Sequence, residues 1–256
     1  MGNGMKLEGK IALITGGGTG IGKAAAQIIS LEGGISIVAG RRIAPLEETV
    51  AEITRAGGKA MAFSTDVTSI EDIAKLRDII KNKYGRLDIL VNNAGSALFK
   101  SFLDTTVEDL DRLYQVDLRS VFLVSQYMVP LMKEGGGGSI INVSSILGVL
   151  GGKKVSAYCA MKGGVVQLTR ALAAELGPDI RVNCLCPSHI ITDMMEDEMQ
   201  RIEAAGKLGQ LNKMFPMKRV GYPQDIKGIL LFFASEDSAW LTGNIFMVDG
   251  GLSCYV

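Results

Sequence analysis

The stretch that decides the fold is Ile11-Ala-Leu-Ile-Thr15-Gly16-Gly-Gly-Thr19-Gly20-Ile21-Gly22, near the start of the chain. Its first residues are apolar and predict a short buried strand, and the alanine-rich segment that follows predicts a helix. Glycines between a strand and a helix let the backbone approach an anion, which the N–H groups at the helix N-terminus can bind. A glycine-rich turn alone can be only a tight turn, so the evidence lies in its flanking elements. We therefore predict a dinucleotide site that uses Gly16, Thr19, Gly20, Ile21 and Gly22.

Outward from this unit, short apolar runs alternate with longer segments of helical period. The expected strands are 11–15, 36–40, 60–65, 87–92, 139–144, 181–186 and 245–248. The expected helices are 21–32, 44–56, 70–84, 107–133, 156–176, 192–206 and 224–234. Such alternation is typical of βαβ units, and no linker, composition shift or repeat interrupts it. We predict α/β class, with residues 1–256 as one doubly wound Rossmann domain: a seven-stranded parallel sheet with helices on both faces.

The composition indicates which kinds of partner, compartment and metal site the protein is expected to have. The 27 basic and 27 acidic residues balance, so no net charge draws the chain to nucleic acid or to an anionic membrane, and a small-molecule substrate is expected. No apolar run of about 20 residues and no leader-like segment in residues 1–10 is present, which predicts a cytoplasmic protein. The single histidine, His189, and the spacing of four cysteines predict no metal site and reduced thiols.

The end of the second expected strand indicates which nucleotide binds. A carboxylate commonly stands here to contact the ribose 2′-OH, but this chain has Gly40-Arg41-Arg42. Two guanidinium groups could bind a 2′-phosphate through charge-assisted hydrogen bonds, or they could simply solvate a loop. We predict that Arg41 and Arg42 give a preference for NADP(H), with NAD(H) as the other candidate.

Tyr158 and Lys162 stand four residues apart in an expected helix and therefore share one face, about 6 Å apart along its axis. A nearby ammonium favours ionisation of a phenol, so we expect Lys162 to bring the pKa of Tyr158 down from about 10. Ser145 ends the fifth expected strand and could donate a hydrogen bond to a substrate oxygen while Tyr158 delivers the proton. Tyr-x-x-x-Lys is common in helices, and serines at strand ends often bond backbone, a role better suited to Ser144.

With these residues in view, the chain resembles the short-chain dehydrogenase/reductase family from about residue 7 to residue 251. The turn at 15–22 matches the family's cofactor turn, and Ser145, Tyr158 and Lys162 match its catalytic set. The resemblance further implies cofactor contacts at Asp66-Val67 and at Asn93-Ala94-Gly95, which follow Asn92. It also implies contacts at Pro187, Ile190 and Thr192, in the segment that includes Asn183 and Ser188. Tyr158 and Lys162 are expected to contact the cofactor as well. It also implies a homotetramer.

Two positions depart from the family's pattern. The fourth catalytic residue of the family is asparagine, which supports a helix kink and a water beside the lysine; here it is Asp117. A carboxylate can accept a hydrogen bond from that water but cannot donate one as an amide does. Ser188 replaces a usual glycine, which matters only if the turn needs positive φ.

The resemblance implies an NAD(P)-dependent oxidoreductase acting on CH–OH groups, with a lid at about 189–219. This segment contains five methionines and one phenylalanine: Met194, Met195, Met199, Met214, Phe215 and Met217. Methionines fill irregular apolar space, so we expect a ketone or secondary alcohol with an alicyclic, aromatic or steroid-like body, although these side chains could instead pack the lid onto the protein. The other interpretations are a 3-oxoacyl-carrier-protein reductase, for which no basic docking surface is evident, and a non-catalytic NADP(H)-binding regulatory protein.

Overall fold

A computed structural model describes residues 4–255, apart from the side chains of 196–198 and 255. Its seven strands form one parallel sheet in the order β3-β2-β1-β4-β5-β6-β7. The strands are β1 (Ile11–Thr15), β2 (Ile35–Gly40), β3 (Lys59–Ser64), β4 (Ile89–Asn92), β5 (Gly138–Val143), β6 (Ile180–Pro187) and β7 (Ile245–Val248). The predicted doubly wound parallel fold is confirmed, with strand ends displaced by at most two residues.

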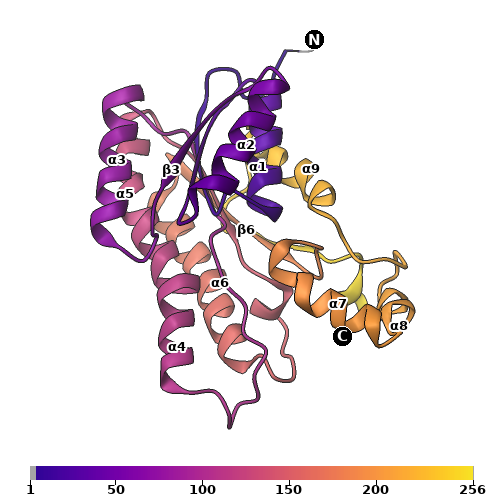
Figure 1. Cartoon of the computed structure of the whole chain (residues 1–256). Coiled ribbons are helices and arrows are strands. Elements are labelled where there is room, and N and C mark those ends of the chain that lie inside the picture. The colour runs from indigo at the N-terminus through magenta and orange to yellow at the C-terminus, as the bar shows by residue number, and fades with distance from the viewer. Residues whose placement is uncertain (1–3, 256) are drawn as a thin grey trace.

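Helices cover both faces of this sheet (Figure 1). They are α1 (Gly20–Leu31), α2 (Ile43–Arg55), α3 (Ile70–Tyr84), α4 (Val107–Leu113), α5 (Ser120–Glu134), α6 (Ser156–Leu176), α7 (Glu196–Ala204), α8 (Leu208–Lys213) and α9 (Pro223–Ala234). Helices α1, α2 and α9 pack on one face, and α3, α5 and α6 pack on the other. Among residues 4–255, no helix combines the length and low charge needed to cross a bilayer.

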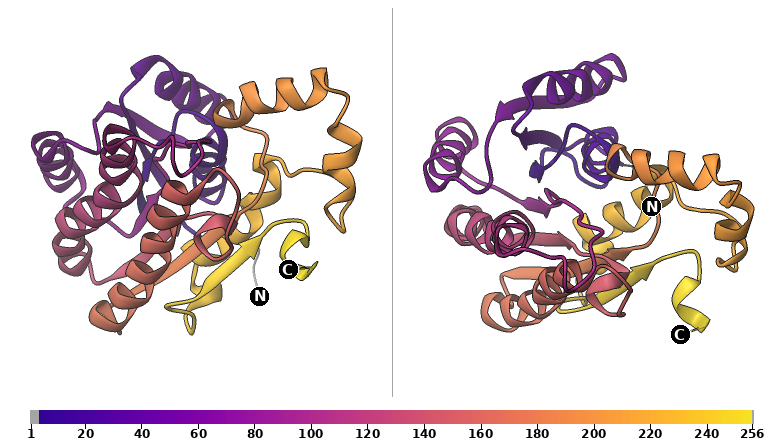
Figure 2. Two further views of the ribbon diagram at one scale, coloured as in Figure 1. Left: turned by 90° about the horizontal axis from the view of Figure 1, so that it is seen from below. Right: turned by 60° about the horizontal axis from the view of Figure 1, so that its bottom comes forward.

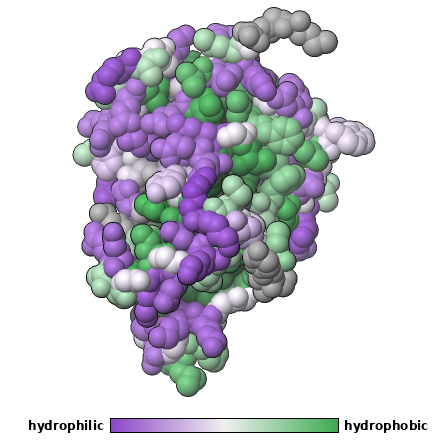
Figure 3. Space-filling view, turned by 90° about the vertical axis from the view of Figure 1, so that its right-hand side faces the viewer, coloured by the Kyte–Doolittle hydropathy of each residue, from purple (hydrophilic) through white to green (hydrophobic). Residues whose placement is uncertain are grey.

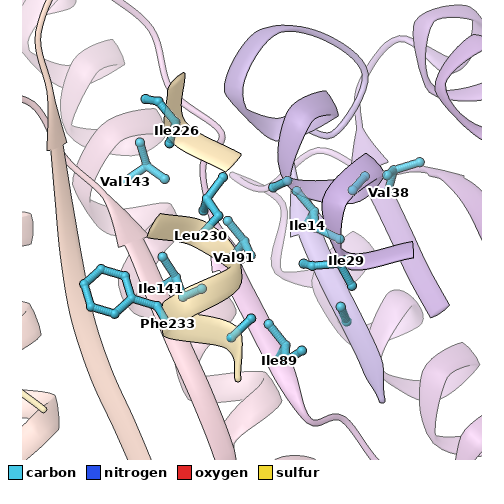
Figure 4. Packing of buried hydrophobic residues seen from close by; sticks show 14 of the residues in the cluster. Ile14, Ile29, Val38, Ile89, Val91, Ile141, Val143, Ile226, Leu230 and Phe233 are labelled. Carbon is cyan, nitrogen blue, oxygen red and sulfur yellow. The ribbon is translucent and has the colours of Figure 1, made fainter. Parts of the chain in front are cut away.

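Alternate residues of each strand supply the two cores. Ile14 and Ile141 point toward α9, where Ile226, Leu230 and Phe233 fill the space beside them (Figure 4). The intervening residues, such as Leu13, belong to the core on the opposite face. Because side chains alternate along a strand, a sheet covered on both faces requires continuous apolar runs, which is the pattern that the sequence shows.

The core beside α9 offers a test of packing under the site. Ile141→Val in β5 is expected to lower the free energy of unfolding by about 1 kcal/mol, because it removes one buried methyl group that the fully buried site cannot replace. Urea unfolding, compared at equal m-value, measures this change. Ile43→Val at the exposed start of α2 is the matched control and should change stability by less than about 0.5 kcal/mol. Equal effects at the two positions would contradict the packing argument.

The long helix expected over 107–133 is interrupted. A π-helical segment, Tyr114–Arg119, separates α4 from α5 and contains Asp117. The wider turn of a π-helix changes which residues face inward, and Asp117 becomes fully buried. The prediction of one regular helix was therefore wrong at its centre.

The segment after β6 also differs from the expected helix over 192–206. A 3₁₀ turn (Asp193–Met195) precedes α7, which ends before Gly206, and the unexpected α8 follows. Both views in Figure 2 show the orange α7–α8 segment standing out from the body of the sheet. Its two ends are joined by a parallel bridge between Ile190 and Gly221. The chain segment between Ile190 and Gly221 therefore begins and ends at neighbouring positions.

Candidate active site

A cleft of about 610 Å³ opens at the carboxyl ends of the strands. The order of the strands reverses between β1 and β4, and in doubly wound sheets this reversal is where ligands bind. Loops after β1, β2, β4, β5 and β6 all contribute to the cleft wall. Segments far apart in the chain thus meet at one site.

Thr15 and Asn93 tie together the two loops at this reversal. The Thr15 hydroxyl accepts hydrogen bonds of 3.0 Å from the backbone N–H groups of Asn93 and Ala94, and donates to the carbonyl of Val91. The Asn93 amide donates to the carbonyls of Thr15 and Gly16. These bonds fix the backbone of the glycine-rich turn against the end of β4.

Glycines in this turn serve two purposes. Gly16 and Gly20 line the cleft and have positive φ values of 66° and 54°. Gly22 does not line the cleft, and a Cβ atom there would lie 2.2 Å from the carbonyl oxygen of Gly16. Gly22 is therefore required for close packing of α1 on the turn. Its predicted contact with the cofactor stays a prediction.

The same turn fits the pyrophosphate of a dinucleotide. Thr19 caps α1 without a side-chain hydrogen bond, and the first turn of that helix carries no acidic residue. Backbone N–H groups at this helix end consequently have no competing side-chain acceptor from the cap, and no carboxylate repels an anion. Gly18, Thr19 and Ile21 line the cleft beside them.

Arg41 and Arg42 line the cleft on the loop after β2, and both are exposed. Asp66 is the only acidic residue among the described residues that line the cleft. Burial raises the pKa of its carboxyl, but hydrogen bonds from Thr68 and the charge of Arg41 outweigh burial and bring the pKa below its ordinary value. Positive charge is therefore concentrated on this loop.

Ser145, Tyr158 and Lys162 converge as predicted, and all three line the cleft. Tyr158 and Lys162 both lie on α6, one turn apart. The Nζ atom of Lys162 is 5.7 Å from the centre of the Tyr158 ring. Its Nζ also donates to the carbonyl of Val143 at the end of β5. Ser145 Oγ accepts a hydrogen bond from the Leu147 N–H at 3.1 Å, which leaves its own proton free to point elsewhere.

Ser144 has the structural role that strand-end serines commonly fill. Its hydroxyl donates a 2.8 Å hydrogen bond to the backbone carbonyl of Lys162 and is buried. The expectation that Ser144, rather than Ser145, bonds to the backbone is confirmed for Ser144. Ser188 is also tolerated, since its φ is not positive.

The pKa of Tyr158 does not move in the direction expected. Burial raises it, and the positive charge of Lys162 and a hydrogen bond with Ser145 lower it, while the negative charge of Asp117 raises it again. The net pKa lies above the ordinary value of a phenol. The expected influence of Lys162 is present, but the sequence did not reveal that burial and Asp117 would exceed it.

Asp117 lies behind the cleft rather than in its wall. Its Oδ1 is 3.3 Å from Lys162 Nζ, and its oxygens accept hydrogen bonds from the N–H and the hydroxyl of Ser96. A Cβ atom at Gly95 would lie 2.9 Å from the same carboxylate, so glycine is needed there. The predicted catalytic position is thus in contact with Lys162 and separated from the cleft.

The remaining predicted cofactor residues all line the cleft: Val67, Asn93, Ala94, Gly95, Pro187, Ile190 and Thr192. Sequence reasoning missed several other wall residues, among them Pro45, Leu46, Thr65, Thr68, Ser96 and Val116. Thr65 ends an expected strand and Pro45 begins an expected helix, so their positions beside the sheet edge were the available signal. Nothing in the local sequence indicated Val116.

The apolar residues of the lid segment divide into three groups. Met194 and Met195 line the cleft. Met199 and Phe215 pack within the segment, where Phe215 is buried against Leu211 and Val220, while Met214 and Met217 are exposed. Leu147 also lines the cleft, whereas Leu98 and Leu150 do not. Met194 and Met195 are therefore the two methionines placed to meet a ligand in the cleft, and contact of any of these side chains with substrate stays a prediction.

Comparison with known proteins agrees with this geometry. Residues 16–253 match the family model described as enoyl-(acyl carrier protein) reductase. The crystal structure of a short-chain type dehydrogenase/reductase from Mycobacterium marinum, 35% identical, superposes with a TM-score of 0.91 over 98% of each chain. The chain belongs to the short-chain dehydrogenase/reductase family.

Relatives in this family have different substrates. The 3-oxoacyl-[acyl-carrier-protein] reductase of Thermotoga maritima is 38% identical over 251 residues, or 97% of this chain and 99% of its own. The 7alpha-hydroxysteroid dehydrogenase of Escherichia coli is 36% identical over 248 residues, or 96% and 95%. A Beutenbergia cavernae protein solved with NADP at low occupancy has a TM-score of 0.91 at 30% identity, over 98% of this chain and 99% of its own. This short-chain dehydrogenase/reductase is an NAD(P)-dependent oxidoreductase acting on CH–OH groups.

Proposed function

We propose that this enzyme transfers hydride between NADP(H) and a ketone or secondary alcohol with an apolar body, with Tyr158 as the general acid and base. The observation that carries the proposal is the shared cleft: Ser145, Tyr158 and Lys162 converge in it, and Arg41 and Arg42 lie on its wall. One ligand could therefore extend from a cationic loop to a proton donor. The nicotinamide ring of such a ligand supplies or accepts the hydride.

The protein's own residues manage the proton. In carbonyl reduction, Tyr158 Oη gives its proton to the carbonyl oxygen while Ser145 donates a hydrogen bond to the same oxygen. In alcohol oxidation the transfers reverse. An ammonium has three donors, and Lys162 directs two of them at Val143 and Asp117, which leaves one for the cleft. We assign that donor to the ribose of the cofactor.

The preference for NADP(H) is supported by charge. Arg41 and Arg42 are exposed on the cleft wall after β2, where a 2′-phosphate would need cationic partners. Gly40 at this edge offers no carboxylate to a free 2′-OH. The relative from Beutenbergia cavernae that holds NADP adds support.

The substrate end of the cleft supports an apolar body. Its wall includes Phe99, Ile146, Leu147, Met194 and Met195. An alicyclic, aromatic or steroid-like ketone would bury its hydrocarbon against these side chains while its oxygen meets Tyr158. The relative named as a hydroxysteroid dehydrogenase adds support for this class.

A 3-oxoacyl-carrier-protein reductase is the second candidate, because the Thermotoga maritima relative has that name and the match between the two proteins covers nearly the whole of both chains. The two functions differ in what must dock: an acidic carrier protein needs a basic surface beside the cleft, whereas a free ketone needs none. The non-catalytic NADP(H)-binding alternative is disfavoured by the relatives, which are named reductases and dehydrogenases.

A panel of ketones with NADPH, followed by absorbance at 340 nm, tests the proposal. It includes decalones, aryl ketones, keto-steroids and a 3-oxoacyl thioester, each repeated with NADH. We expect kcat/KM for at least one free apolar ketone to exceed that for the thioester, and NADPH to exceed NADH at least tenfold. The reverse order of substrates would establish the second candidate, and a tenfold preference for NADH would overturn the assignment of the cofactor.

We also propose that residues 189–219 act as a lid and that the enzyme assembles as a cytoplasmic homotetramer. The bridge between Ile190 and Gly221 joins the two ends of this segment, and Met217 N–H donates a hydrogen bond to the carbonyl of Gly250 near its far end. Large apolar side chains are exposed, including Phe102, Leu103 and Trp240, and Figure 3 shows hydrophobic residues exposed among hydrophilic ones on the face that it presents. Sedimentation velocity should give a species of four 27.3 kDa chains. A monomer at micromolar concentration would contradict the assembly.

A further inference from the structure

An ion pair lies directly behind the proposed proton donor. Asp117 is 0% exposed and Lys162 is 4% exposed, and Oδ1 and Nζ are 3.3 Å apart. Both carboxylate oxygens accept from Ser96, at 3.0 and 3.2 Å from its N–H, with 2.7 Å from its hydroxyl to Oδ2. Ser96 and Lys162 both present donors to the carboxyl group, which is the arrangement that suits a carboxylate.

The charges around Tyr158 can be followed through one proton transfer. With the phenol neutral, Asp117 and Lys162 carry opposite charges and cancel. Loss of the Tyr158 proton would then leave one uncompensated negative charge on a partly buried side chain, which is unfavourable. An uncharged residue at 117 would instead leave Lys162 to neutralise the phenolate.

Other titratable groups face this pair from each packed element. Cys159 lies on α6 beside Tyr158. Cys184 and Cys186 lie on β6 near Lys162, and their sulfur atoms are 4.0 Å apart. The hydroxyl of Ser145, at the end of β5, also interacts with Tyr158. The effects of Cys159 and Cys184 act in the same direction as that of Asp117. Among the described residues that act on Tyr158, Asp117 is the carboxylate.

We propose that Asp117 is a positioning residue that holds Lys162 as an ammonium ion and keeps Tyr158 protonated, so that carbonyl reduction persists to alkaline pH while alcohol oxidation requires higher pH. The inference rests on the proposed role of Tyr158 as proton donor. No bond to substrate or cofactor is required of Asp117. Its effect passes entirely through Lys162 and the phenol.

The directions in which the pKa values of Lys162 and Tyr158 are shifted agree with this geometry. Burial lowers the pKa of Lys162, but the phenol and Asp117 raise it more, and the net pKa lies above its ordinary value. Asp117 also raises the pKa of Tyr158. The raised pKa favours Lys162 as the ammonium ion, and the phenol is the group that loses and regains a proton in the proposed reaction.

The direct test is a titration of Tyr158 in the full protein without substrate. Labelling the six tyrosines with carbon-13 at Cζ gives one resonance each, and Tyr158→Phe identifies the one from Tyr158. In Asp117→Asn, an isosteric neutral variant, the Tyr158 midpoint should fall by on the order of one pH unit. Asp117→Ser, also neutral, should shift it the same way and serves if the first variant does not fold, as judged by thermal melting.

Ser96→Ala is the matched control, because it removes a hydrogen bond from the same carboxylate but retains the charge. Its Tyr158 midpoint should stay or rise. An unchanged midpoint in the neutral variants, or an equal fall in Ser96→Ala, would overturn the inference.

Kinetics separate this inference from the proposed function. In Asp117→Asn, the alkaline limb of ketone reduction and the acid limb of alcohol oxidation should both move to lower pH by the titration shift. If the titration moves but no ketone is reduced by the wild type, the electrostatic inference stands and the proposed function fails. If reduction depends on Tyr158 but neither limb nor midpoint moves, the proposed function stands and the inference fails.

Discussion

Tyr158→Phe is expected to lower kcat for ketone reduction about 10³-fold, because the variant keeps the ring but removes the hydroxyl that lies beside Ser145 and is proposed to donate the proton. Steady-state rates with NADPH measure the loss. The dissociation constant of NADPH, from quenching of protein fluorescence, should change less than threefold, since all the other proposed cofactor contacts are retained.

Tyr127→Phe provides the control for this variant. Tyr127 lies on α5, outside the cleft, with Arg77 5.6 Å from its ring centre. Its kcat should equal that of the wild type within twofold. A Tyr158→Phe enzyme with more than a tenth of wild-type turnover would show that another group supplies the proton.

Replacing both Arg41 and Arg42 by alanine is expected to raise KM for NADPH on the order of 100-fold and to leave KM for NADH within threefold. Each hydrogen bond to a charged group contributes about 1.5–3 kcal/mol, so loss of two at a 2′-phosphate exceeds the effect of one neutral contact. Initial rates at saturating ketone, over a range of each cofactor, measure both constants.

Arg55→Ala at the exposed end of α2 is the matched loss of charge on the helix that follows these arginines. Its effect on KM for NADPH should stay below twofold. If the double variant weakened NADPH and NADH equally, the arginines would be binding something common to both cofactors, such as the pyrophosphate. Raising the salt concentration should weaken NADPH more than NADH in the wild type.

Much of the site was readable because its signals are local. The strand, glycine turn and helix from Ile11 to Leu31 lie in one continuous stretch, and the spacing of Tyr158 and Lys162 fixes them on one helical face. Ser145 could be placed from the end of β5. Convergence of all three then followed from the rule that parallel strands share one carboxyl edge.

What could not be predicted depends on contacts distant in sequence. The π-helical turn around Asp117 has no apolar period of its own, and its purpose becomes visible only beside Ser96 and Lys162. The bonds from Thr15 to the loop after β4 span nearly 80 residues. The pKa of Tyr158 was misjudged for the same reason, since burial is a property of the packed protein.

Asp117 stands behind the wall of the cleft, whereas Phe99, Leu147 and Met194 form that wall. If both proposals hold, different amino acids determine the selectivity for the substrate and the pH at which the enzyme works. Directed evolution could retune either trait alone: a carboxylate-to-amide exchange would alter operating pH, and wall substitutions would alter which ketones are accepted.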